Sequence, residues 1–157
     1  MGVSGCGKTT IGRLLSSLLN IPFHDGDDYH SEENKRKMSS NLPLTDVDRA
    51  PWLESLSLLL SSHEDVILAC SALRRCYRDR LASRAGGKLL FVYLAVTREE
   101  ARDRISRRRG HYFGEEMVDS QFQTLEEPGE EEEAVTVDAT EDIDVIGNNI
   151  VTILSRY

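Results

Sequence analysis

Two spacings of apolar residues alternate along this chain. Between Ile11 and Leu19, apolar residues recur every three or four positions, which places them on one face of a helix that begins near Lys8. Residues 89–95 are instead continuously apolar, a pattern typical of a strand that is buried on both faces. The rest of the chain repeats one pattern or the other.

This alternation predicts the fold class. We expect strands over residues 21–25, 66–70, 89–95 and 134–137. We expect helices over residues 8–19, 48–60, 72–83, 98–109, 117–125 and 143–154. Because strands and helices alternate, the sequence predicts one α/β domain, with a parallel sheet between two layers of helices.

Length, charge and cysteine content narrow the class of protein. The chain has 157 residues and a net charge of -8, with the acidic excess in residues 110–157, which argues against nucleic-acid binding. Since no long apolar run and no signal-peptide pattern occurs, we expect no membrane partner. The three cysteines lack metal-like spacing, so we expect a cytoplasmic protein without disulfides. The four glutamates at residues 130–133 predict a solvated loop.

The strongest motif lies at residues 2–9, which read G-V-S-G-C-G-K-T and match the phosphate-binding loop G-x-x-x-x-G-K-[ST]. Glycines let the backbone curl so that its N–H groups point at phosphate oxygens. Lys8 would reach the β- and γ-phosphates of ATP, and the Thr9 hydroxyl would coordinate Mg²⁺. The residues predicted to bind ATP here are Gly2, Val3, Ser4, Gly5, Cys6, Gly7, Lys8, Thr9 and Thr10.

One feature departs from the usual phosphate-loop pattern. A buried strand normally leads into the loop, and here only Met1 precedes it. We therefore expect a fold whose first strand is missing or truncated. Two explanations stay open: Met1 is an internal methionine of a chain that starts about ten residues earlier, or this is a shortened form.

An acidic cluster, H-D-G-D-D-Y-H, follows the first predicted strand at residues 24–30. The carboxyl end of such a strand faces the ligand crevice in α/β proteins. Asp27 could therefore orient an attacking hydroxyl and accept its proton, and Asp25 could hold Mg²⁺ through water. The alternative is an acidic turn that caps a helix beginning near Ser31.

Several blocks resemble gluconokinase of the small phosphate-loop type. Besides the loop, they are residues 25–38 (D-G-D-D-Y-H-S-E-E-N-K-R-K-M), 43–53, 69–79, 110–113 (G-H-Y-F) and 120–128 (S-Q-F-Q-T-L-E-E-P). The resemblance implies phosphorylation of D-gluconate by ATP, a shikimate-kinase-like fold with a helical lid near residues 107–125, a cytosolic location and often a homodimer. It runs in order along nearly the whole chain.

A polyol carboxylate needs a cation for its acid end and polar groups for its hydroxyls. Arg49 is the first candidate for the carboxylate, with a surface ion pair to Asp46 or Asp48 as the alternative. Arg74, which follows the second predicted strand, is another candidate, or else an exposed residue at a helix start. His30 could bind a hydroxyl, or else be an exposed histidine at the start of a helix.

Arginines are concentrated in residues 98–109, just before the predicted lid. An arginine there could stabilise charge on the transferring phosphoryl group, and another could stack on adenine. The candidates are Arg108 for catalysis, Arg104 and Arg107 for ATP, and His111 and Gln121 for the substrate. The alternative is a basic helix paired with its own acidic residues.

Two other functions stay open. One is a kinase for a different small sugar acid such as shikimate, although A-C-S-A at residues 69–72 replaces the glycine triplet of shikimate kinases. The other is a shortened, non-catalytic protein that at most binds nucleotide.

Overall fold

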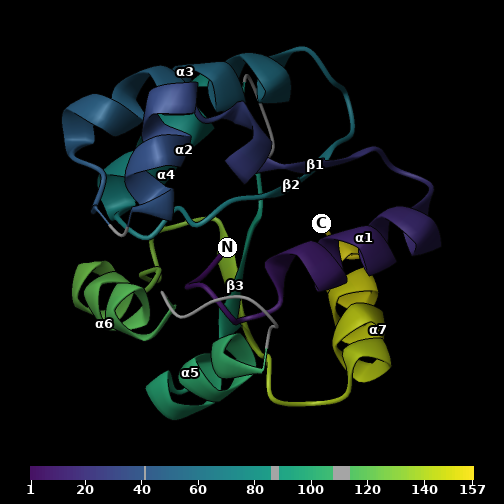
Figure 1. The fold of residues 1–157 in the computed structure, drawn as a ribbon. Coiled ribbons are helices and arrows are strands. Elements are labelled where there is room, and N and C mark those ends of the chain that lie inside the picture. The colour runs from purple at the N-terminus through teal and green to yellow at the C-terminus, as the bar shows by residue number, and fades with distance from the viewer. Residues whose placement is uncertain (41, 86–88, 108–113) are drawn as a thin grey trace.

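The structure, a computed structural model, describes residues 1–40, 42–85, 89–107 and 114–157 (Figure 1). Its strands are β1 (Phe23–Asp25), β2 (Ile67–Ala69), β3 (Phe91–Ala95) and β4 (Ala134–Asp138). Its helices are α1 (Lys8–Leu19), the 3₁₀ helix η1 (Gly26–Tyr29), α2 (Glu32–Ser39), α3 (Asp46–Ser61), α4 (Arg75–Arg84), α5 (Arg98–Ser106), α6 (Gly114–Thr124) and α7 (Ile143–Leu154). The predicted α/β class is confirmed.

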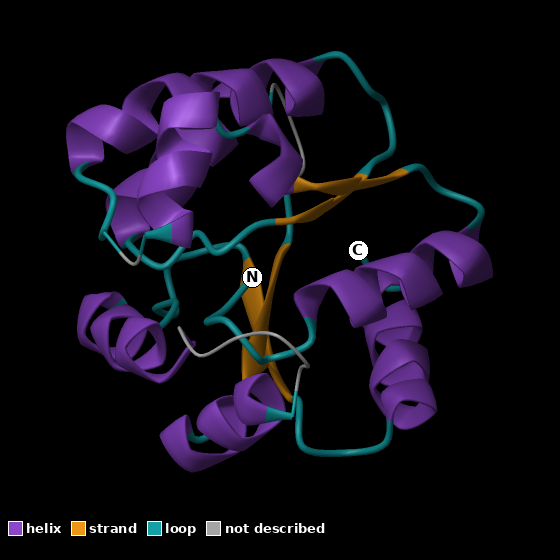
Figure 2. Cartoon of the chain, viewed as in Figure 1, coloured by secondary structure: helices purple, strands orange, loops and turns teal. Residues whose placement is uncertain are grey.

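The helices cover two sides of the strands (Figure 2). On one side, α3 and α4 form a core around Leu56 and Leu81 that reaches Cys70 beside β2. On the other side, α1 and α7 contribute Ile11 and Ile150 to a second core, which includes β3, β4 and α5. Burial of apolar surface in these two cores is the main force that holds the layers together.

The strands form two parallel pairs, β1–β2 and β3–β4, in agreement with the parallel strands and the missing first strand that the sequence predicts. Among the described residues, backbone bonds of Met1 and Gly2 bridge the two pairs. The Met1 amino group donates to Val92 O, Leu94 N–H donates to Met1 O over 3.0 Å, and Gly2 N–H donates to Ser71 O over 3.1 Å. A break therefore separates β2 from β3.

A cavity of about 700 Å³ occupies this break. Side chains of α1, β2, β3 and α7 line it, among them Leu15, Leu68, Val92 and Ile150. Met1, which carries one of the two backbone bridges, also lines the cavity. The two bridges also fix where the chain enters the phosphate-binding loop.

One local prediction was wrong, and another holds with one exception. The helix predicted from residue 72 begins at Arg75. The run at residues 130–133 is a loop with exposed glutamates, except that the Glu132 side chain is only 8% exposed. Arg78 binds the carbonyl oxygens of Ala72 and Leu73, which keeps them out of a helix, and it also binds the Glu132 carboxylate. No helix among the described residues is both long and apolar enough to cross a membrane.

Candidate functional site

The phosphate-binding loop runs from the break between the strand pairs into α1. Gly5 and Gly7 adopt φ angles of 85° and 98°, a left-handed conformation that favours glycine. At Gly5 a side chain is also excluded by space, since its Cβ would lie 2.7 Å from Ala101 O. Lys8 curls back and donates to Gly2 O and Val3 O over 3.0 and 2.9 Å, which keeps its ammonium at the loop. The start of α1 adds a positive dipole end at this place.

The acidic cluster meets the loop at the end of β1. The Thr9 hydroxyl donates to Asp25 Oδ2 over 2.8 Å, and Asp27 N–H donates to Asp25 Oδ1 over 3.2 Å. Loss of solvation raises the pKa of the Asp27 carboxyl above its usual value; the Lys8 charge opposes this shift and the Asp25 charge adds to it. A carboxyl whose pKa is raised in this way is suited to accept a proton from a substrate hydroxyl.

The oxygen atoms of Thr9 and Asp25 fit Mg²⁺, a hard cation that prefers oxygen ligands. Among the described residues no group of three His, Cys, Asp or Glu side chains could enclose a metal. A site with so few protein ligands suits Mg²⁺, which keeps several waters and is shared with substrate phosphates. The alternative was that an acidic residue of this cluster caps the helix that begins near Ser31. That helix is α2, and the Ser31 side chain caps it instead.

His30, at the end of this cluster, is buried and not exposed at a helix start. Its ring stacks on Trp52 with centroids 4.4 Å apart, and Trp52 Nε1 donates to Gly26 O over 2.7 Å. Burial, followed by the charges of Arg49 and Lys35, lowers the pKa of His30 to about 4. The imidazole is therefore neutral at pH 7 and can both donate and accept a hydrogen bond.

Sequence reasoning missed Asn34, which is buried next to His30. Its Nδ2 lies 3.4 Å from His30 Nδ1 and donates to Asp48 O over 2.8 Å, so it orients the ring. Asn34 falls within the gluconokinase-like block at residues 25–38, but nothing in its spacing marked it.

Two predicted arginines converge on one aromatic ring. The guanidinium carbons of Arg49 and Arg74 lie 5.7 and 6.0 Å from the centre of the Tyr77 ring. Arg49 also donates to Leu44 O, while Arg74 makes the ion pair with Asp46 at 3.1 Å that had been considered for Arg49. Two guanidinium groups this close together can bind a carboxylate through charged hydrogen bonds.

The lid region is described in part. Arg104 donates to Ala139 O over 2.6 Å and lies 3.5 Å from Gly5 O, which places it beside the phosphate loop. Arg107 is exposed and pairs with Asp103 at 2.9 Å, as the basic-helix alternative expects. Gln121, on α6, accepts from Ser4 N–H over 2.6 Å. Arg108 and His111 lie outside the described residues.

Comparison with known proteins agrees with this geometry. The shikimate kinase family model matches residues 4–151. The chain is 43% identical to a probable gluconokinase of Mus musculus, over 87% of this chain and 85% of the relative. It is 38% identical to a gluconokinase of Gluconobacter oxydans, over 96% of this chain and 86% of the relative.

Solved structures agree as well. A gluconokinase from Sinorhizobium meliloti 1021 superposes with a TM-score of 0.92 at 40% identity, covering 99% of this chain and 89% of that one. A shikimate kinase from Aquifex aeolicus superposes with a TM-score of 0.60 at 19% identity, which shows the shared fold alone. The chain therefore belongs to the shikimate kinase family and, within it, to the gluconokinases.

Proposed function

We propose that this chain transfers the γ-phosphoryl group of Mg-ATP to D-gluconate and forms 6-phospho-D-gluconate and ADP. One observation carries the chemistry: the Thr9–Asp25 hydrogen bond brings the phosphate loop to Asp27, which has a raised pKa. The relatives named gluconokinase support the choice of acceptor.

In this proposal the acceptor oxygen of gluconate attacks the γ-phosphorus, and the bond to the leaving oxygen of ADP breaks. Asp27 takes the proton of the attacking hydroxyl. The loop N–H groups and Lys8 bind phosphate oxygens, and the start of α1 stabilises their charge. Thr9 directly, and Asp25 through water, would hold Mg²⁺, which supplies neutralisation of the phosphate charge when bound.

The acceptor is held at the other end of the site. Arg49 and Arg74, beside Tyr77, would bind the gluconate carboxylate, and neutral His30 would bind a hydroxyl. A neutral imidazole suits a hydroxyl because it can donate to it or accept from it.

The lid completes the proposal. Arg104, beside the loop, would contact bound ATP, and Gln121, which accepts from Ser4 N–H, would contact the substrate. Arg107, Arg108 and His111 stay predicted nucleotide, catalytic and substrate residues of the lid. The cytoplasmic location and the homodimer also stay predictions.

The direct test is ADP release by the purified 157-residue chain with Mg-ATP and a panel of sugar acids. We expect turnover with D-gluconate and little with shikimate or glucose. Turnover with shikimate alone would overturn the choice of acceptor. Binding of nucleotide without turnover of any acid would favour the non-catalytic alternative.

A further inference from the structure

The phosphoryl-transfer chemistry proposed above leaves one buried charge unused. Arg78, on α4, is 1% exposed, and the Glu132 side chain that faces it is 8% exposed. Buried charges are rare unless they are paired and fully hydrogen-bonded, because they lose their hydration. This pair therefore needs a structural or functional reason.

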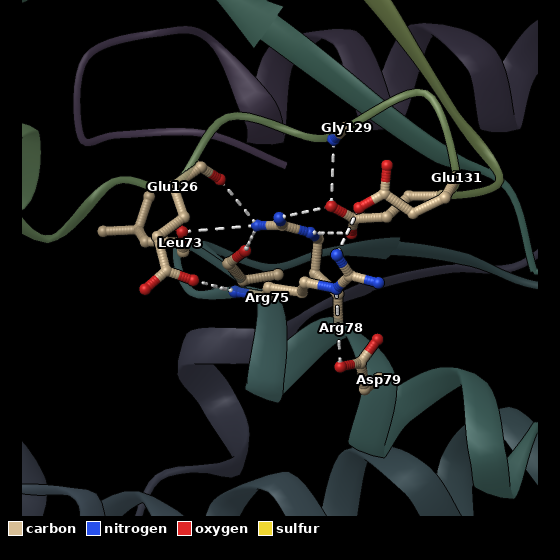
Figure 3. A network of polar contacts seen from close by, with 9 residues as sticks. Leu73, Arg75, Arg78, Asp79, Glu126, Gly129 and Glu131 are labelled. Carbon is tan, nitrogen blue, oxygen red and sulfur yellow. Dashed lines mark hydrogen bonds and ion pairs between the residues drawn. The ribbon is translucent and has the colours of Figure 1, made fainter.

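Each nitrogen of the Arg78 guanidinium has a hydrogen-bond partner (Figure 3). Its Nε and Nη2 donate to the two oxygens of Glu132, the second over 2.8 Å, in the two-pronged geometry that only arginine provides. Its Nη1 is shared among the carbonyl oxygens of Ala72, Leu73 and Glu126, at 3.1, 3.3 and 2.9 Å. A lysine could hold the charge but could not reach all these oxygens.

These partners belong to two segments far apart in the sequence. Ala72 and Leu73 form the turn from β2 into α4, whereas Glu126 and Glu132 follow α6. Two backbone N–H groups also donate between these segments, in addition to the exposed Arg75–Glu131 ion pair: Glu126 N–H donates to Leu73 O over 2.8 Å, and Arg75 N–H donates to Glu126 Oε2 over 2.6 Å. Figure 3 shows Arg78 at the centre of this junction.

Both sides of the junction lead to the candidate site. On one side, α6 is fixed to the phosphate loop by the bond between Gln121 and Ser4 N–H. On the other side, the turn at Leu73 continues directly into Arg74, one of the two arginines beside Tyr77. A continuous path of contacts therefore links the nucleotide end of the site to its acceptor end.

We infer that Arg78, locked by Glu132, is a positioning residue that sets the place of Arg74 relative to the phosphate loop. This inference rests on the proposed function, in which Arg74 binds the acceptor carboxylate. The expected consequence is specific. Loosening the junction weakens binding of the acceptor, while binding of ATP at the loop is retained.

The test compares Glu132→Gln with Glu131→Gln. The control removes a neighbouring carboxylate whose ion pair with Arg75 is half-exposed. For Glu132→Gln we expect KM for gluconate to rise roughly tenfold with KM for ATP unchanged, because small displacements of a binding group are costly. A purely structural role would lower the melting temperature and the apparent kcat but leave both KM values at wild type, which would overturn the inference.

Two further measurements keep the inference separable from the proposed function. Trp52 is the only tryptophan, and its ring stacks on His30, so its fluorescence can report gluconate binding without turnover.

The second measurement is hydrogen exchange of the backbone amides of Arg75 and Glu126. It should accelerate in Glu132→Gln and not in Glu131→Gln, whichever sugar acid the enzyme phosphorylates. Unchanged exchange would overturn the inference even if gluconate were not the substrate. If Glu132→Gln does not fold, Arg78→Lys, which retains the charge, carries the same expectations.

Discussion

The Thr9 hydroxyl donates a 2.8 Å hydrogen bond to the Asp25 carboxylate, which joins the first turn of α1 to the end of β1. These residues are 16 positions apart in the chain. In the proposed reaction, magnesium and the acceptor hydroxyl would meet beside this bond, and the first prediction follows from it.

Thr9→Val keeps the shape of the side chain but removes the hydroxyl. We expect the Mg²⁺ concentration for half-maximal activity to rise by roughly tenfold or more, as for other losses of a group that supports a metal. A magnesium titration at saturating ATP measures this. The matched control is Thr152→Val on α7, whose hydroxyl bonds only Asn148 O within its own helix. An unchanged magnesium requirement in Thr9→Val would refute the assignment.

Asp27→Asn removes the proposed proton acceptor. We expect kcat to fall by about 10²- to 10⁴-fold, the usual contribution of a general base. The pH profile gives a second check. Because the pKa of Asp27 is raised, kcat of the wild type should increase with pH through a range above that of an ordinary carboxyl. That limb should be missing in Asp27→Asn, and a wild-type-like profile in the variant would exclude Asp27 as the base.

Arg49→Gln and Arg74→Gln test the carboxylate clamp. Loss of a charged hydrogen bond costs about 1.5–3 kcal/mol, so KM for gluconate should rise by about 10- to 100-fold in each variant. KM for ATP should stay near the wild-type value. Arg80→Gln, which loses an exposed pair with Glu54, is the control. Equal rises in both KM values would point to a general distortion instead.

His30 makes stability depend on pH. Its pKa in the folded chain is about 4, below the value of about 6.5 in an unfolded chain. The unfolded state therefore binds the proton more readily than the folded state. The contribution of neutral His30 to the free energy of unfolding is fully present above pH 6.5 and is lost as pH falls towards 4. The total effect is up to about 3 kcal/mol. Urea unfolding between pH 7 and pH 4.5 should show a smaller loss for His30→Gln than for the wild type.

The reaction rates of the cysteines with a thiol reagent measure how readily solvent enters the cavity between β2 and β3. Cys6 and Cys70 are buried, Cys70 lines the cavity, and burial raises the pKa of Cys70 to about 12. Cys76 is exposed. A thiol reagent at pH 8 should therefore modify Cys76 quickly and the other two only after unfolding. Fast modification of Cys70 would mean that the cavity opens readily to solvent.

The phosphate loop and α7 show what sequence alone could predict. Each depends on local rules: glycines that permit left-handed φ angles, and an apolar face at helical spacing. Helix α7 has the predicted bounds, Ile143–Leu154. Asp25 and Asp27 were likewise marked by their place after a strand, because the carboxyl ends of parallel strands face the ligand crevice.

Tertiary structure decided what depends on residues distant in the chain. No local pattern distinguishes Asn34, which gains its role from contacts with His30 and Asp48 O. Four glutamates in a row indicate solvent exposure, and three of them are exposed, yet the Glu132 side chain is only 8% exposed because Arg78, 54 positions away, supplies the opposite charge. The sequence predicts a fold that lacks its first strand, but only the fold shows that the other strands form the separate pairs β1–β2 and β3–β4. An apolar strand pattern predicts that a segment forms a strand, whose backbone needs hydrogen-bond partners along its edges. Only the tertiary structure decides which other segment supplies those partners.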